Sequence, residues 1–159
     1  MLFVTYEEAL ATIASLAPRG WRLGLERMER LVAEAGLDGA IGPRPRFVHV
    51  AGTNGKGSVT AFAQALLVAM GRRTGGYFSP YVVDPRERIQ IGGELIDPDE
   101  FARLTSRLWP VAERIGEVTE FEFKTALGFL AWQEAGCEWV ALETGLGGRF
   151  DATNVVTPR

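Results

Sequence analysis

The chain has 159 residues, of which 47% are hydrophobic and 23% are charged, and its net charge is −3. This size and composition suit one globular domain with its own core, and the acidic balance excludes the basic surface typical of a nucleic-acid-binding protein. No apolar run reaches membrane-spanning length, and the N-terminus lacks the basic start of a signal peptide. The single Cys137 excludes an intramolecular disulfide. We therefore expect a cytoplasmic protein without nucleic-acid or membrane partners.

The first part of the chain is predicted to be helical. Thr5 and Glu8 have the spacing of a capping box, and the helix that they begin should end near Leu16. A second helix is expected over Gly24–Ala35, where apolar residues recur on one face and Gly36 follows as a C-terminal cap.

The stretch Phe47–Ser58, FVHVAGTNGKGS, is the strongest local signal. A short apolar strand leads into a glycine-rich loop, and the apolar helical stretch VTAFAQALLVAM follows. A strand, a glycine loop with a lysine and then a helix are typical of a phosphate-binding loop, whose backbone N–H groups surround a phosphate. The predicted nucleotide-binding residues are Gly52, Thr53, Asn54, Gly55, Lys56, Gly57 and Ser58. The alternative is a plain glycine-rich turn, and Gly57 departs from the common spacing by separating Lys56 from Ser58.

Two further strands and a hairpin are expected in the middle and at the end of the chain. Thr74–Ser79 is short and aromatic, Ile89–Ile96 indicates a hairpin about Gly92-Gly93, and Glu138–Glu143 is an apolar strand that ends in an acid. A carboxylate at such a strand end can hold magnesium beside a phosphate loop; the alternative is a strand-end glutamate in solvent.

Two helices lie between these strands. Asp97-Pro98 begins one that should run toward Ile115, with a kink or a break possible at the interior Pro110. A capping box at Thr119 and Glu122 begins another, which continues to Ala135.

Four motifs, in this order, resemble those of the folylpolyglutamate synthase/dihydrofolate synthase family of the Mur ligase superfamily. They are GTNGKGS (Gly52–Ser58), Ser79-Pro80-Tyr81 with the following RERI, TEFEFKT (Thr119–Thr125) and LETGLGGRFDATN (Leu142–Asn154). The last is the most specific after the phosphate loop. Tyr81 stands where many members of the family have histidine.

The resemblance implies a role for each matching residue. Lys56 and Glu143 would be catalytic, the loop would bind ATP, and Ser79 and Glu143 would ligate Mg²⁺. The implied substrate-binding residues are Thr119, Phe121, Arg149 and Asp151, with a further role near the pterin considered for Gly24, Leu25 and Arg27.

Local explanations compete with some of these roles. Ser79-Pro80 by itself could be an ordinary turn, Thr119 and Glu122 are accounted for as helix caps, and His49, the only histidine, is better explained as a hydrogen-bonded core imidazole than as a catalytic group.

We therefore expect an α/β fold, a mainly parallel sheet with helices on both faces, in which the phosphate-loop strand lies beside the Glu143 strand. By the resemblance, residues 1–159 are the N-terminal portion of a Mur-ligase-like ATP-binding domain, incomplete and without the C-terminal domain. The implied reaction is ATP-dependent amide formation, in which L-glutamate is added to dihydropteroate or a folate through an acyl phosphate. We expect the full-length protein to be monomeric and this fragment to be inactive and to self-associate.

Three alternatives remain open at this stage. One is another Mur-type amino-acid ligase, and a second is a different phosphate-loop enzyme, although the N-K-x-D segment of a GTPase is missing from the sequence. The third is a truncated, non-catalytic module that binds a nucleotide or a folate.

Overall fold

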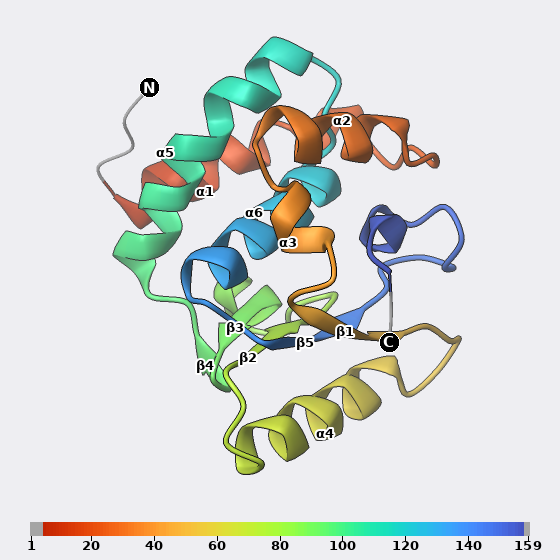
Figure 1. Cartoon of the computed structure of the whole chain (residues 1–159). Coiled ribbons are helices and arrows are strands. Elements are labelled where there is room, and N and C mark those ends of the chain that lie inside the picture. Colours follow the sequence, from red (N-terminus) through yellow and green to blue (C-terminus); the bar gives the residue numbers. More distant parts are fainter. Residues whose placement is uncertain (1–4, 158–159) are drawn as a thin grey trace.

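A five-stranded sheet lies at the centre of the computed structural model, which describes residues 5–157 (Figure 1). Its strands are β1 (Arg46–Val50), β2 (Thr74–Tyr77), β3 (Ile89–Ile91), β4 (Glu94–Leu95) and β5 (Trp139–Glu143). Their spatial order is β1-β5-β2-β3-β4, with β1, β5 and β2 parallel and the β3–β4 hairpin antiparallel. The α/β class and the pairing of the phosphate-loop strand with the Glu143 strand are confirmed. The sheet is mixed rather than mainly parallel, because the hairpin adds two antiparallel strands to one edge.

Helices cover both faces of this sheet, as expected (Figure 1). One face carries α1 (Tyr6–Ala14), α2 (Glu26–Glu34), the short α3 (Asp38–Ile41), α5 (Pro98–Ile115) and α6 (Glu120–Glu134). The other face carries α4 (Lys56–Ala69). Short 3-10 helices lie at Ala17–Arg19, Pro85–Arg88 and Ala152–Val155.

The central helix α6 is buried along most of its length, between the sheet and the outer helices. Trp132 is fully buried, and its indole Nε1 donates to the Gln90 carbonyl at 3.0 Å. A Cβ at Gly75 of β2 would lie 2.4 Å from the Trp132 ring, so only glycine lets the strand approach this helix so closely.

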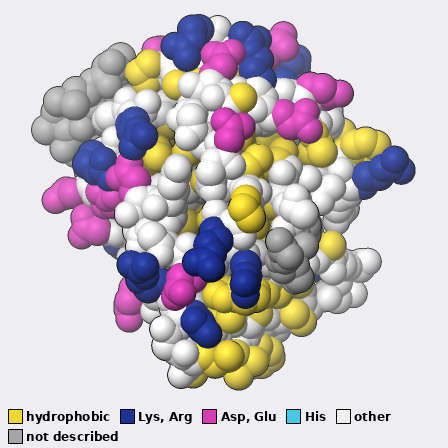
Figure 2. Space-filling view, in the orientation of Figure 1, with side chains coloured by type: hydrophobic (Ala, Val, Ile, Leu, Met, Phe, Trp, Pro, Cys, Tyr) yellow, Lys and Arg dark blue, Asp and Glu magenta, His cyan; other side chains and the backbone are white. Residues whose placement is uncertain are grey.

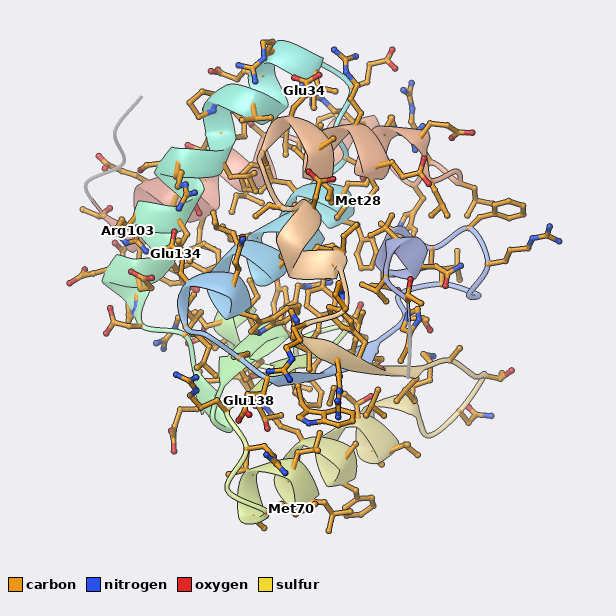
Figure 3. All side chains as sticks on the ribbon, viewed as in Figure 1. Met28, Glu34, Met70, Arg103, Glu134 and Glu138 are labelled. Atoms are coloured by element: carbon orange, nitrogen blue, oxygen red, sulfur yellow. The ribbon has the colours of Figure 1, made fainter. Side chains whose placement is uncertain are left out.

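The long helix α5 runs through Pro110 without a break. Asp97 caps its N-terminus by accepting from two backbone N–H groups, and Gly116 ends it in a left-handed conformation. Glu134 of α6 pairs with Arg103 and Arg107 of α5, which joins the two helices at the surface. Figure 3 shows Arg103 and Glu134 side by side.

The outer face of α4 is apolar and exposed. Val59, Phe62, Leu66 and Met70 follow one another at helical spacing, and each is between 52% and 69% exposed. Figure 2 shows the hydrophobic surface that gathers over α4, and Figure 3 shows Met70 at the end of the helix. Within residues 5–157, no helix is both long and apolar enough to cross a bilayer.

Candidate nucleotide and substrate site

The segment after β1 forms a loop that leads directly into α4. Gly55 is the N-cap of α4 at a φ of 77°, a left-handed conformation that favours glycine, and no side chain caps this helix start. The first N–H groups of α4 are therefore available to an anion. Lys56 begins the helix, and its Cγ lies 3.9 Å from the position that a Cβ would take at Gly52, so the lysine runs back beside the loop.

Ser79 and Glu143, the two residues predicted to bind a metal, lie together at the carboxyl ends of the parallel strands β2 and β5. The backbone N–H of Ser79 donates to Glu143 Oε2 at 2.9 Å. A Cβ at Gly57 would lie 3.8 Å from both carboxylate oxygens of Glu143. The Glu143 carboxylate, on a residue only 5% exposed, thus lies between the phosphate loop and Ser79.

This arrangement is compatible with magnesium. Glu143 Oε1 accepts no hydrogen bond from any described residue, which leaves one carboxylate oxygen free while Oε2 accepts from the Ser79 backbone N–H. Mg²⁺ prefers oxygen ligands and commonly takes one or two carboxylates together with water and substrate phosphates. No group of three His, Cys, Asp or Glu side chains that could hold a metal occurs in residues 5–157, so Glu143 and Ser79 would supply only part of the coordination sphere.

A pocket of about 230 Å³ opens beside these strand ends. It is formed by the loop after the first 3-10 helix, the start of α6 and the loop after β5. Its lining includes Trp21, Arg88, Thr119, Phe121, Lys124 and Asp151. Three of the four predicted substrate-binding residues, Thr119, Phe121 and Asp151, therefore line one pocket. Arg149 is exposed and is not part of the lining, and its substrate role stays a prediction.

An aromatic pair forms one side of the pocket. The Trp21 and Phe121 rings stack with centroids 5.2 Å apart and an interplanar angle of 25°. A Cβ at Gly145 would lie 2.5 Å from Phe121 Cζ, so the glycine loop that follows β5 packs directly against this ring. The sequence motifs did not identify Trp21.

The Asp151 carboxylate holds the glycine loop in place. Oδ1 accepts from the backbone N–H groups of Gly145 and Leu146, at 3.1 and 2.9 Å, and Oδ2 accepts from Thr153 N–H. His49 Nε2 lies 2.9 Å from the Thr153 hydroxyl, and burial lowers the pKa of His49. These contacts support the interpretation of His49 as a hydrogen-bonded imidazole with a structural role, although the residue is half-buried and lies outside the hydrophobic core.

The cap of α6 is tied to α2. Thr119 and Glu122 form the predicted capping box, and the buried Glu122 also accepts from Arg27 Nε at 3.1 Å. Arg27 in turn donates to the Arg22 carbonyl, which fixes the pocket-lining loop of residues 20–23. Gly24, Leu25 and Arg27 follow this loop without lining the pocket, so Arg27 acts on it indirectly.

Arg88, like Trp21, is a pocket residue to which sequence reasoning assigned no role. It ends the Pro85–Arg88 turn, is only 8% exposed and lines the pocket. Its Nη1 donates to the Ser79 hydroxyl at 3.4 Å and to Tyr77 Oη at 3.5 Å. Arg88 belongs to the RERI motif, residues 86–89. The motif does not reveal that the Arg88 side chain is buried, because this burial depends on the tertiary structure.

This chain is similar in sequence and in structure to known proteins. No family model matches it. The dihydrofolate synthase/folylpolyglutamate synthase of Bacillus subtilis is 40% identical over 99% of this chain, which covers 37% of that protein. A bifunctional folylpolyglutamate synthase/dihydrofolate synthase from Yersinia pestis, complexed with AMPPNP and a Mn ion, is similar at a TM-score of 0.88 and 33% identity, over 99% of this chain and 38% of its own. E. coli FolC in complex with DHPP and ADP is similar at a TM-score of 0.84 and 31% identity, over 94% of this chain and 36% of its own.

These similarities extend over nearly the whole chain, which spans little more than a third of the length of the proteins that it matches. The phosphate loop, the Ser79–Glu143 contact and the aromatic pocket all lie within the matched region. The chain is a homologue of the folylpolyglutamate synthase/dihydrofolate synthases, which belong to the Mur ligase superfamily.

Proposed function

We propose that this chain carries the ATP-, magnesium- and pterin-binding part of a ligase that adds L-glutamate to dihydropteroate or a folate. The observation that carries the proposal is the position of Glu143, whose carboxylate lies against both Gly57 of the phosphate loop and Ser79. The pocket with the Trp21–Phe121 pair lies beside it. Homologues complexed with AMPPNP and a Mn ion, and with DHPP and ADP, support the same pairing of ligands.

The residues suit phosphoryl transfer to a carboxylate. A substrate carboxylate oxygen attacks the γ-phosphorus, ADP leaves, and the amine of L-glutamate then displaces phosphate from the acyl phosphate to form the amide. Catalysis of the first step rests on positioning and charge neutralisation. Lys56 and the open N–H groups of α4 would bind phosphate oxygens, while Glu143 and Ser79 would hold Mg²⁺, which neutralises phosphate charge when bound. No protein nucleophile is needed.

Competition between ligands tests this proposal. Saturable binding of dihydropteroate to the 159-residue chain can be followed by tryptophan fluorescence, since Trp21 stacks on Phe121, and Trp21→Phe identifies the responding residue. We expect pteroate to compete and a UDP-linked cell-wall precursor not to compete. Competition by the UDP-linked precursor alone would instead assign the chain to another Mur-type ligase.

A second candidate function is binding without turnover. It is favoured by the span of the chain, which covers only 37% of the Bacillus subtilis relative. Release of phosphate from ATP, measured with dihydropteroate and L-glutamate both present, separates the two. We expect ligand binding without glutamate-dependent turnover from these 159 residues alone, and glutamate-dependent turnover would exclude the non-catalytic module.

A further inference from the structure

Arg88 is a buried cation without a carboxylate partner. No acid within residues 5–157 forms an ion pair with it, and its Nε is buried without any hydrogen-bond partner. Its hydrogen bonds, to the hydroxyl groups of Tyr77 and Ser79, are long at 3.5 and 3.4 Å. A buried charge with an unsatisfied donor is costly to a fold, so an arrangement of this kind suggests that an anion completes it.

The aromatic rings around Arg88 offset only part of that cost. Its guanidinium carbon lies 5.7 Å from the ring centroids of Tyr77 and Phe121 and 5.9 Å from that of Tyr81. Rings attract a cation through their faces but do not accept the in-plane N–H groups of guanidinium. The favoured partner of these N–H groups is an oxyanion, which can accept two of them at once.

Lys124 provides an internal comparison. It also lines the pocket, but Glu120 forms an ion pair with it. Both cations lie against the Tyr81 ring, with Arg88 Cζ 5.9 Å and Lys124 Nζ 5.8 Å from its centroid, and burial together with the nearby charge of Arg88 lowers the pKa of Lys124.

Arg22, the third cation of the lining, pairs with Glu117, so Arg88 is the lining cation without an ion pair among the described residues. The Asp151 carboxylate lines the pocket as well, but its oxygens accept from the backbone N–H groups of Gly145, Leu146 and Thr153.

The position of Arg88 defines which end of a ligand it would meet. On one side it contacts Ser79, whose N–H binds Glu143 beside the phosphate loop. On the other side Phe121 stacks on Trp21. An aromatic acid in this pocket would have its rings near Trp21 and its charged end near Ser79.

We propose that Arg88 binds the reacting carboxylate of the pterin-linked aromatic acid and holds it toward Ser79, Glu143 and the phosphate loop. This inference rests on the proposed function and assigns the orientation of its substrate. The γ-phosphate of ATP is an oxyanion as well, but none of residues 52–58 lines the pocket that contains Arg88, so the carboxylate is the occupant that the geometry favours.

The test compares an acid with its neutral analogue. Pteroate and its primary carboxamide have the same rings, and binding of each to the 159-residue chain is measured by tryptophan fluorescence. The variants are Arg88→Gln, Arg88→Lys and, as a matched control, Arg86→Gln, which removes a charge from the same turn where Arg86 pairs with Asp84. Thermal melts establish that each variant is folded, and Arg88→Lys carries the test if Arg88→Gln does not fold.

We expect the unmodified chain and Arg86→Gln to bind pteroate about 10-fold or more tighter than the carboxamide, as for a hydrogen bond to a charged group. Arg88→Gln should lose this preference and Arg88→Lys should keep only part of it. Because Arg88 also contacts Ser79, the diagnostic result is the selective loss of affinity for the acid, with magnesium-ATP binding measured alongside. If Arg88→Gln weakened the binding of pteroate and of the carboxamide equally, the role of Arg88 would be wrong but the proposed function would stand. The same conclusion would follow if Arg88→Gln lost magnesium-ATP binding and still preferred pteroate to the carboxamide. Failure of the unmodified chain to bind pteroate would overturn the proposed function itself, and the role of Arg88 with it.

Discussion

The backbone N–H of Ser79 donates to Glu143 Oε2 across 64 residues of sequence. The contact forms because β2 and β5 are parallel neighbours, so both chain segments leave the sheet at the same edge. The pairing of β1 with β5 brings the phosphate loop to that edge too. The two residues that the motifs assigned to magnesium are thus adjacent to each other and to the loop.

Glu143→Gln should weaken magnesium-dependent nucleotide binding while the fold persists. The amide oxygen can still accept from Ser79 N–H, but the charge that attracts the cation is removed. We expect a loss of at least about 10-fold in affinity for the metal-bound nucleotide, since even outer partners of metal ligands have effects of that size. Calorimetric titrations with and without Mg²⁺ measure it. Glu138→Gln, near the start of the same strand, is the control, and an equal loss there would contradict a specific role of Glu143.

Gly145→Ala should destabilise the chain and disturb the pocket. The new Cβ would lie 2.5 Å from Phe121 Cζ and 3.1 Å from Asp151 Oδ1, so the ring has to shift at a cost of about 1–3 kcal/mol in unfolding free energy. Denaturant melts measure the cost, and Trp21 fluorescence reports the shift of the ring.

A second substitution makes this prediction specific. Phe121→Leu should relieve most of the effect of Gly145→Ala, because it removes the ring atoms that clash. Gly39→Ala serves as the control, since its nearest neighbour would be 3.5 Å away. Additive effects of the Gly145 and Phe121 substitutions would contradict the close contact.

His49 should make the stability of the chain depend on pH. Burial lowers its pKa in the folded state, so the unfolded chain binds the proton more readily. The contribution of His49 is therefore complete above the ordinary pKa of 6.5 and is lost as the pH falls from there through the lowered pKa. Urea melts at pH 8 and at pH 5 should show a smaller decrease in stability for His49→Gln than for the unmodified chain. The same decrease in both would refute the assignment.

The apolar face of α4 should cause self-association. Val59, Phe62, Leu66 and Met70 present a continuous exposed stripe, of the kind that associates in water. Sedimentation velocity should show concentration-dependent association of the 159-residue chain, which Phe62→Glu and Leu66→Lys together should reduce. Val83→Glu removes an even more exposed apolar side chain elsewhere, and an equal reduction by that variant would argue against the stripe.

The features that local sequence determines were predictable. The capping boxes at Thr5 and Thr119 form as expected, because each depends on residues only three apart. The phosphate loop and the Glu143 strand were found for the same reason, since a glycine loop between a strand and a helix is a local pattern.

Tertiary contacts account for what the sequence did not reveal. The short helix α3 was missed, because its four residues have no clear periodicity. The close approach of Gly75 to Trp132 and the burial of Arg88 without an acid depend on elements that are distant along the chain. The stacking of Trp21 on Phe121 joins segments 100 residues apart, and no local pattern predicts it.

The measurement that tests the account most directly is magnesium-ATP binding to the 159-residue chain by calorimetry, beside Lys56→Ala and the surface control Arg30→Ala. The account predicts saturable binding to the unmodified chain and to Arg30→Ala, and its loss in a folded Lys56→Ala. Absence of binding to the unmodified chain, or equal binding to Lys56→Ala, would contradict a phosphate loop at Gly52–Ser58.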